Sequence, residues 1–378
     1  MAQPSKETVV RALAAGAAAA GAVISARALL KPQQRSSERR LIDWEVVRQV
    51  AYERSGESAR GGLARDDVTR FSSDYDAMAA QLAPLLGEVC DQVPFALPRF
   101  VALDRHGFID VNIAIIRRLL EPVEKLRATL PDSLATTLGR RVLDRYIGEL
   151  LGLMSRRVLG QYDPVMSLGA PTDEALPPAS LYLVEPNLIA VQREQRVAGE
   201  PLRRWIILHE LTHAWQFGQH PWLRAHLEEI MRSVLLDTVS TDGMRFMRSQ
   251  ELLQRLPHTV RTQLKTVSRV QAVMSVLEGY SNFVMHRVGR KHLDNADQLE
   301  DALHRRREDR TLLERLVMAL TGLELKMRQY ELGERFCEAV VDQSDLATLN
   351  RVWTSAEAMP SMEEVRNPAR WVARTSLT

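Results

Sequence analysis

The chain of 378 residues has few cysteines, few aromatic residues and almost no excess charge of either sign. Two cysteines, Cys90 and Cys337, are too few for a disulfide framework, and neither has a second cysteine at the spacing of a metal site. Fifty basic against 48 acidic residues leave a formal charge of +2, which argues against a nucleic-acid-binding protein. Aromatic residues make up only 6%, whereas 45% of the residues are apolar and alanine, leucine and arginine are abundant. This composition excludes a disordered chain and predicts an ordered, mainly helical protein. The two cysteines indicate a reducing compartment or a protein indifferent to redox conditions.

The sequence also lacks a long, strongly apolar run. The uncharged stretch between Arg11 and Arg27 consists mainly of alanine and glycine, whereas a membrane span needs roughly 20 strongly apolar residues. We therefore expect an Ala-rich helix followed by a polar linker over residues 31–40, and a cytoplasmic protein. The alternative is export or membrane association through residues 1–30, because Lys6 and Arg11 precede the stretch as they would in a secretory signal.

From residue 41 onward, apolar residues recur at helical spacing, and Asp43 is placed to cap the first helix. Residues 181–184 (LYLV) and 188–191 (LIAV) are short β-prone runs separated by Glu-Pro-Asn, a pattern that predicts a hairpin. The predicted fold is therefore mainly α with a small β hairpin or sheet. We expect an extension over residues 1–40, a helical portion over 41–175 and a catalytic domain over 176–378. The helical periods cover residues 41–55, 66–93, 111–130, 138–164, 226–239, 259–289, 296–341 and 347–353, with turns expected at 97–100 and 104–108. Within 138–164 the helix is expected to end before Gly160 and Pro164.

One short segment carries recognisable chemistry, the sequence His209-Glu210-Leu211-Thr212-His213. On a helix, residues four apart share one face, so both imidazoles can point at one metal ion. Glu210 sits beside that face, where it can accept a proton from a metal-bound water without binding the metal. Two imidazoles and a carboxylate suit zinc, with an open fourth position for water. The alternative is a helix with two half-buried histidines satisfied by neighbouring side chains.

Two residues are candidates for the third metal ligand. His220 is one residue out of register with the third histidine of a metzincin and would point about 100° away on a continuing helix. Glu278 is the better candidate, because it lies on an otherwise apolar helical face where an unpaired carboxylate is costly. Its alternative role is an ion pair with an arginine in the core. Three side chains could hydrogen-bond the ring nitrogen of a ligand histidine that does not bind the metal: Asn282, Asp237 and Asp242.

Other polar residues have a possible role at such a site. Tyr280 and His286 carry donors of the kind that stabilise an oxyanion, although ordinary packing explains both equally well. A polar cluster ends the apolar helix that is expected to begin at residue 138. For this cluster we favour capping and ion pairing over a role facing the metal. Its members are Arg156, Arg157, Gln161, Tyr162 and Asp163.

Several segments in fixed order resemble a known family. The sequence is similar to the bacterial zincin-like, zinc-dependent metalloproteases that are often labelled deazaflavin-coenzyme-biosynthesis-associated proteins. The resemblance runs from about Leu41 to Arg374 and does not cover the first forty residues. The segments are IDWEVV (42–47), SRRVLGQYDP (155–164), LYLVEPNL (181–188), HELTHAWQF (209–217), VMSVLEGYSNFVM (273–285), GLELKMRQYELGERF (322–336), LNRVW (349–353) and NPARWVAR (367–374).

The resemblance implies a zincin-type catalytic domain with a helical N-terminal portion. It also implies zinc bound by His209, His213 and Glu278, with Glu210 as general base. Asn282 stands where related zinc proteins with a glutamate ligand have aspartate, and an amide cannot stabilise a positive imidazole as a carboxylate does.

The sequence therefore predicts a zinc-dependent hydrolase, a peptidase that acts on a peptide or protein substrate. The rival hypothesis is a non-catalytic helical interaction protein that retains a structural or vestigial zinc site. A further alternative is a hydrolase of a non-peptide amide. A fourth protein ligand would favour the structural site, and an open coordination position would favour the enzyme.

Overall fold

The computed structural model describes residues 42–57, 62–91, 93–127, 134–162, 180–239, 252–308 and 323–376. These residues form two compact units, each assembled from separate stretches of the chain. The first contains the described residues up to Gly62 together with Arg105–Arg157, and the second contains Leu63–Asp104 and the described residues from Val158 onward. The Ala-rich extension lies outside the described residues. The contiguous division at residue 175 stays a prediction, because compactness alone does not test which segments fold on their own.

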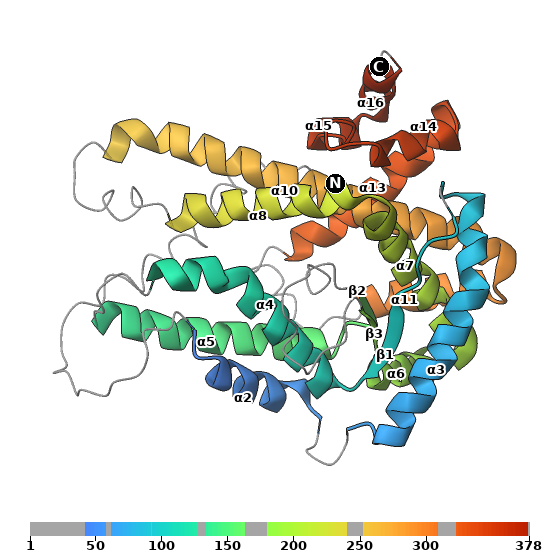
Figure 1. The fold of residues 1–378 in the computed structure, drawn as a ribbon, viewed down its shortest axis with the longest axis horizontal. Helices are drawn as coiled ribbons and strands as arrows, with labels where there is room; N and C mark the ends of the chain where they lie inside the picture. The colour runs from blue at the N-terminus through green and yellow to red at the C-terminus, as the bar shows by residue number, and fades with distance from the viewer. Residues whose placement is uncertain are drawn as a thin grey trace. The chain divides into compact units, whose positions relative to one another are not determined.

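The first unit is a group of three helices that lie side by side (Figure 1). Asp43 caps the first of them as predicted, since its carboxylate accepts hydrogen bonds from two backbone N–H groups of the first turn. Two glycines allow the third helix to approach the first closely. A β-carbon at Gly148 would lie 2.9 Å from the carbonyl oxygen of Val47, and one at Gly152 would lie 2.7 Å from that of Ala51. The helices are α2 (Trp44–Ser55), α4 (Arg105–Arg127) and α5 (Leu134–Ser155).

The second unit combines a three-stranded sheet with the remaining helices. This confirms the predicted fold class, mainly α with a small sheet. The long helices α8 and α10 run side by side (Figure 1). None of the described helices is both long enough and apolar enough to cross a membrane. The elements are α3 (Arg65–Leu82), η1 (Ala83–Glu88), β1 (Arg99–Leu103), β2 (Gly160–Tyr162), β3 (Ser180–Val184), α6 (Glu185–Gln195), α7 (Gly199–Gln219), α8 (Pro221–Val239), α10 (Leu252–His292), α11 (Ala296–Glu308), α13 (Leu323–Gln343), α14 (Leu346–Asn350), η3 (Arg351–Trp353), α15 (Met362–Arg366) and α16 (Pro368–Thr375).

The sheet has the strand order β1-β3-β2, with β3 parallel to β1 and antiparallel to β2. The central strand is buried from Leu181 to Val184, which explains its continuous apolar run. In the β2–β3 pair, Gly160 faces Leu183 and Tyr162 faces Leu181. The short strand β2 therefore forms one edge of the sheet.

The predicted hairpin is wrong, because residues 188–191 lie in helix α6 and not in a second strand. Pro186 stands in the first helical turn, where a proline costs no hydrogen bond. The Asn187 side chain donates to the Val158 carbonyl at 2.7 Å and holds this turn in place. A four-residue apolar run fits a buried helix as well as a strand, so its sequence alone did not decide between them.

Three further boundaries differ from the prediction. The expected turn at residues 97–100 leads into strand β1, and the expected turn at 104–108 begins helix α4. The helix expected to end before Gly160 ends at Ser155, and Gly160–Tyr162 forms a strand that pairs with β3. In β1 and β2, pairing with the sequence-distant strand β3 replaces a local preference.

The core of the second unit surrounds helix α7. Trp205 and Trp215 of this helix are fully buried, and Trp215 stacks on Tyr280 of α10 with ring centroids 5.7 Å apart. Trp353 packs edge-on against the same two rings. Because neighbours cover most of its surface, α7 is a rigid support for the side chains it carries.

A buried ionic cluster joins α3, α6 and α7. The carboxylate of Glu185 is fully buried and accepts hydrogen bonds from the Tyr75 hydroxyl and the Arg203 guanidinium. Arg203 also donates to the Gly199 carbonyl at 2.9 Å. The cation compensates for the burial of the carboxylate, which would otherwise be costly.

Candidate metal centre

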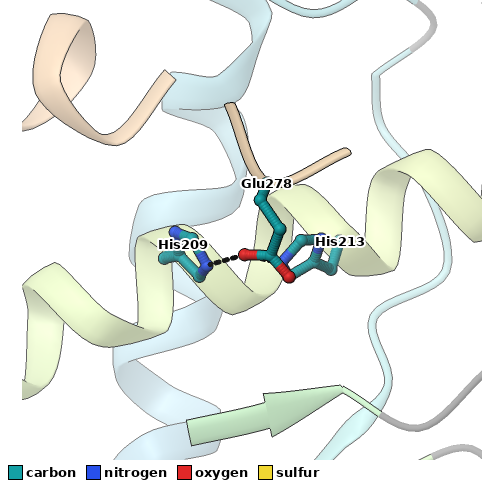
Figure 2. A group of neighbouring side chains, drawn as sticks. All are labelled: His209, His213 and Glu278. Carbon is teal, nitrogen blue, oxygen red and sulfur yellow. Dashed lines mark ion pairs between the residues drawn. The ribbon is translucent and has the colours of Figure 1, made fainter. Parts of the chain in front are cut away.

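Helix α7 carries both histidines of the predicted motif, and helix α10 carries Glu278. The two imidazoles lie on one face of α7, with ring centroids 4.8 Å apart and ring planes nearly perpendicular. Figure 2 shows the carboxyl group of Glu278 between the two rings. Glu278, which follows His213 by 65 residues along the chain, therefore meets the two histidines that the sequence predicted as ligands with it.

The potential metal-binding atoms of these residues converge. Nε2 of His209 lies 3.6 Å and Nε2 of His213 lies 3.7 Å from Oε2 of Glu278. One ligand atom from each residue can be chosen so that all lie within 4.8 Å of one another. The three side chains are 11–23% exposed, so the centre is largely enclosed and still accessible. Among the described residues, no other histidine, cysteine, aspartate or glutamate joins this group.

The spacing of these atoms fits a metal ion better than direct hydrogen bonds. Separations of 3.6 and 3.7 Å exceed those of ordinary hydrogen bonds between nitrogen and oxygen. Ligands bound tetrahedrally at zinc distances lie about 3.3–3.6 Å apart. Two imidazole nitrogens and one carboxylate oxygen are also a donor set typical of catalytic zinc sites.

In the metal-free protein, charge links Glu278 to the histidines. Burial by itself lowers the pKa of His213, but the carboxylate of Glu278 outweighs it and raises the pKa to about 9. Burial likewise favours the neutral form of Glu278, yet His213 and His209 hold the pKa of this carboxyl well below its usual range. A metal ion can replace the proton on His213 as the positive charge that Glu278 faces.

Glu210, the predicted general base, is buried next to the ligands and is 5% exposed. Its carboxylate accepts a hydrogen bond from the backbone N–H of Tyr162 in strand β2. Burial raises the pKa of Glu210; His209 and His213 lower it in part, and Glu278 raises it further. The strand thus supplies a fixed partner for a carboxyl group that has little contact with water.

Strand β2 connects the polar cluster of the sequence analysis to this centre. Capping was favoured for the cluster, but Tyr162 contacts Glu210 through its backbone and stacks its ring on Phe217 of α7, with centroids 5.4 Å apart. Arg156 and Arg157 form the turn that follows α5, and Asp163 lies outside the described residues. The role of β2 was not found from the sequence, because three residues are too few for a recognisable strand pattern.

The partners of His213 also differ from those expected. Its Nδ1 atom lies 2.9 Å from Oε1 of Gln216 and 3.2 Å from Oγ of Ser281. Among the described residues, Asn282 is not a hydrogen-bond partner of either ligand histidine. The side chains of Asp237 and Asp242 lie outside the described residues. The spacing of three residues between His213 and Gln216 on one helix was the available signal for this contact.

His220, the alternative third ligand, lies outside the group. Helix α7 ends at this residue, and the imidazole packs against Trp215 and Trp353, with ring centroids 4.9 and 5.8 Å away. Burial lowers the pKa of His220 to about 4, with partial opposition from Asp91. His220 is therefore a neutral core residue.

The two candidate oxyanion donors are engaged elsewhere. Tyr280 is fully buried and donates to Oδ1 of Asn350 at 2.7 Å. His286 contacts the carboxylate of Glu334 and lies 3.8 Å from that of Glu300. Neither prediction is supported by the structure.

Comparisons with known proteins agree with this arrangement. A family model described as zincin-like metallopeptidase matches residues 42–372. A crystal structure described as that of "a putative hydrolase with a novel fold from Chloroflexus aurantiacus" is similar, with a TM-score of 0.66 and 32% sequence identity over 89% of this chain and 99% of that chain. No curated protein matches the chain. The resemblance found in the sequence is confirmed at the family level, and the link to deazaflavin coenzyme biosynthesis stays a prediction.

Proposed function

The chain belongs to the zincin-like metallopeptidase family, and from that premise we propose that it is a zinc-dependent peptidase. His209, His213 and Glu278 bind the zinc ion, and Glu210 is the general base. The substrate is a peptide or a protein. The similar structure described as a hydrolase supports the same class of reaction.

The observation that carries the proposal is the convergence of the three donors beside a buried glutamate. Nε2 of each histidine lies 3.6–3.7 Å from Oε2 of Glu278, close to the spacing of ligands around one zinc ion. Glu210 follows His209 directly and is held by strand β2. This is the arrangement that hydrolysis of an amide by an activated water requires.

The chemistry divides between the metal and the chain. Zinc held by three protein ligands keeps a position for water, lowers the pKa of that water to about 7 and polarises a carbonyl oxygen. Glu210 accepts a proton from the attacking water as the new C–O bond forms. It then gives that proton to the amine nitrogen as the C–N bond breaks.

The coordination number argues for an enzyme over a structural metal site. Among the described residues, no fourth ligand joins the group, and His220 is packed between tryptophans. A structural zinc site is normally closed by four protein ligands. The rival hypothesis, an interaction protein with a vestigial site, is therefore the less supported one.

The test compares Glu210→Gln with His213→Ala in the full chain. We expect Glu210→Gln to bind one zinc ion per chain and to cleave a peptide library at least about 100-fold more slowly than the wild-type protein. His213→Ala should lose the metal, and chelation should inactivate the wild-type protein. The matched control is Glu200→Gln, which changes an exposed glutamate of the same helix that pairs with Arg204.

The outcomes separate the hypotheses. Wild-type turnover by Glu210→Gln on a validated peptide would contradict the assigned base. Tight zinc binding by the wild-type protein without cleavage of any library peptide would favour the non-catalytic alternative. Cleavage confined to small non-peptide amides would retain the mechanism and correct the substrate class.

A further inference from the structure

His213 has hydrogen-bond partners on the ring nitrogen that faces away from Glu278. Its Nε2 lies 3.7 Å from Glu278, whereas Nδ1 lies 2.9 Å from Oε1 of Gln216 and 3.2 Å from Oγ of Ser281. Both partner side chains are fully buried, with 0% of their surface exposed. Because water does not reach them, their hydrogen bonds must be satisfied within the protein.

One backbone carbonyl fixes the direction of these hydrogen bonds. Nε2 of Gln216 donates to the carbonyl oxygen of Leu277 at 3.0 Å, and Oγ of Ser281 donates to the same oxygen at 3.0 Å. A carbonyl oxygen only accepts, so the amide NH₂ of Gln216 must face it and Oε1 must face His213. Ser281 has a single hydroxyl proton, which is also directed at Leu277. Both side chains therefore present acceptors to Nδ1 of His213.

This arrangement sets the proton on the imidazole. Two acceptors at Nδ1 require an N–H there, which leaves the lone pair of the neutral ring on Nε2. That lone pair faces Glu278, where the metal donors converge. In addition, Leu277 directly precedes Glu278. The hydrogen bond from Gln216 to Leu277 therefore ties α7 to α10 at the turn that carries the carboxylate ligand.

We propose that Gln216 and Ser281 are positioning residues that hold His213 as its Nδ1-protonated tautomer and fix its distance from Glu278. The proposal rests on the metal site of the proposed function but concerns hydrogen bonds that exist without the metal. Both residues act through His213 and have no exposed surface for contact with substrate. Mutation of a residue that hydrogen-bonds a metal ligand in this way typically weakens metal binding by about 10–100-fold.

The test uses Gln216→Met, which keeps a long unbranched side chain and removes the amide, and Ser281→Ala, which removes the second acceptor. We expect zinc to bind about 10–100-fold more weakly in Gln216→Met, measured by competition with a chromophoric chelator. Ser281→Ala should weaken zinc binding less, and the double variant should weaken it most. The control is Gln219→Met, since Gln219 ends the same helix and does not contact His213. Its affinity should equal that of the wild-type protein.

A second measurement separates positioning from general stability. With histidine selectively labelled with ¹⁵N, the Nδ1 proton of His213 should exchange slowly with water in both zinc-loaded and metal-free wild-type protein. The double variant should lose this slowly exchanging proton, whereas Gln216→Glu, which keeps an acceptor, should retain it. Thermal unfolding of each metal-free variant shows whether it is folded, and Ser281→Ala provides a smaller change if Gln216→Met does not fold.

Two results would overturn the proposal. One is zinc affinity within twofold of wild type in a folded variant that lacks both acceptors. The other is a wild-type protein in which Nδ1 of His213 carries no protected proton. If the wild-type protein fails to bind zinc, the proposed function fails, but the Nδ1 proton of the metal-free protein still tests the hydrogen bonds from His213 to Gln216 and Ser281.

Discussion

The backbone of Gly160 lies against the carboxyl group of Glu210, so closely that a β-carbon on residue 160 would be 2.6 Å from Oε1. The glycine lets strand β2 approach α7, and two residues later the N–H of Tyr162 donates to the same carboxylate. Strand β2 thus holds the proposed general base through a close backbone contact and a hydrogen bond. A larger residue at position 160 would have to displace this carboxylate.

Gly160→Ala should therefore slow peptide hydrolysis and leave zinc binding nearly unchanged. The added methyl group meets the end of a side chain, which can move, so the fold should persist while Glu210 loses its position. We expect kcat/KM to fall by about 10–100-fold, which is less than the roughly 100–10,000-fold that a general base contributes, because Glu210 is displaced but not lost. Steady-state kinetics and zinc stoichiometry on the same preparation provide the check.

The matched control is Gly218→Ala on α7. A β-carbon at Gly218 would have no atom within 4 Å, and alanine is favoured over glycine in a helix by up to about 1 kcal/mol. This variant should be equally active and slightly more stable. An equal loss of activity in both alanine variants would show that the contact with Glu210 is not the cause.

Gly333→Ala should strongly destabilise the protein. Helices α10 and α13 cross at Gly279 and Gly333, where a β-carbon on residue 333 would lie 1.8 Å from the carbonyl oxygen of Ser275. The obstacle is backbone, so the helices must separate, at a cost of about 3 kcal/mol or more. Because Gly279 directly follows Glu278, zinc affinity should fall as well.

Urea unfolding of the metal-free protein measures the first effect, and chelator competition measures the second. A loss of stability below about 1 kcal/mol for Gly333→Ala would mean that the two helices do not cross as closely as described.

Stability should fall between about pH 6.5 and pH 4 because of His220. The folded protein lowers the pKa of this buried ring to about 4 from a usual value of 6.5. Below pH 6.5 the unfolded chain therefore takes up a proton that the folded protein does not bind until about pH 4. The effect is absent above the unfolded pKa and grows as the pH decreases through this window. After allowance for solvent screening we expect it to reach about 1–3 kcal/mol.

The comparison variant is His220→Phe, which retains an aromatic ring between Trp215 and Trp353 and removes the titration. Urea unfolding at a series of pH values should show that the wild-type protein loses stability relative to this variant as the pH falls from 6.5 to 4. Parallel profiles for the two proteins would contradict the neutral, buried state of His220.

Arg203→Leu should destabilise the protein more than Tyr75→Phe, although both residues hydrogen-bond the same carboxylate. Loss of Arg203 leaves a fully buried Glu185 without its cation, which typically costs about 3–5 kcal/mol. Loss of the Tyr75 hydroxyl removes one hydrogen bond to a charged group, and such a bond contributes about 1.5–3 kcal/mol to stability. Equilibrium unfolding gives the order of the two variants, and the reverse order would mean that the ion pair adds nothing beyond a hydrogen bond.

The sequence by itself determined the local features of this protein. A spacing of four residues placed His209 and His213 on one helical face, and the position of Asp43 before an apolar helical period identified the first cap. Glu278 was recognisable as an ionisable group on an otherwise apolar face. These predictions succeeded because helical periodicity depends on neighbours along the chain.

Only the tertiary structure decided which distant segments meet. It brought Glu278 to the histidines, placed strand β2 against Glu210, and gave His213 the partners Gln216 and Ser281. It also made a helix of residues 188–191, because short apolar runs suit either element until a neighbouring segment buries them. Packing and buried hydrogen bonds join residues far apart in sequence, and no local pattern encodes their distances.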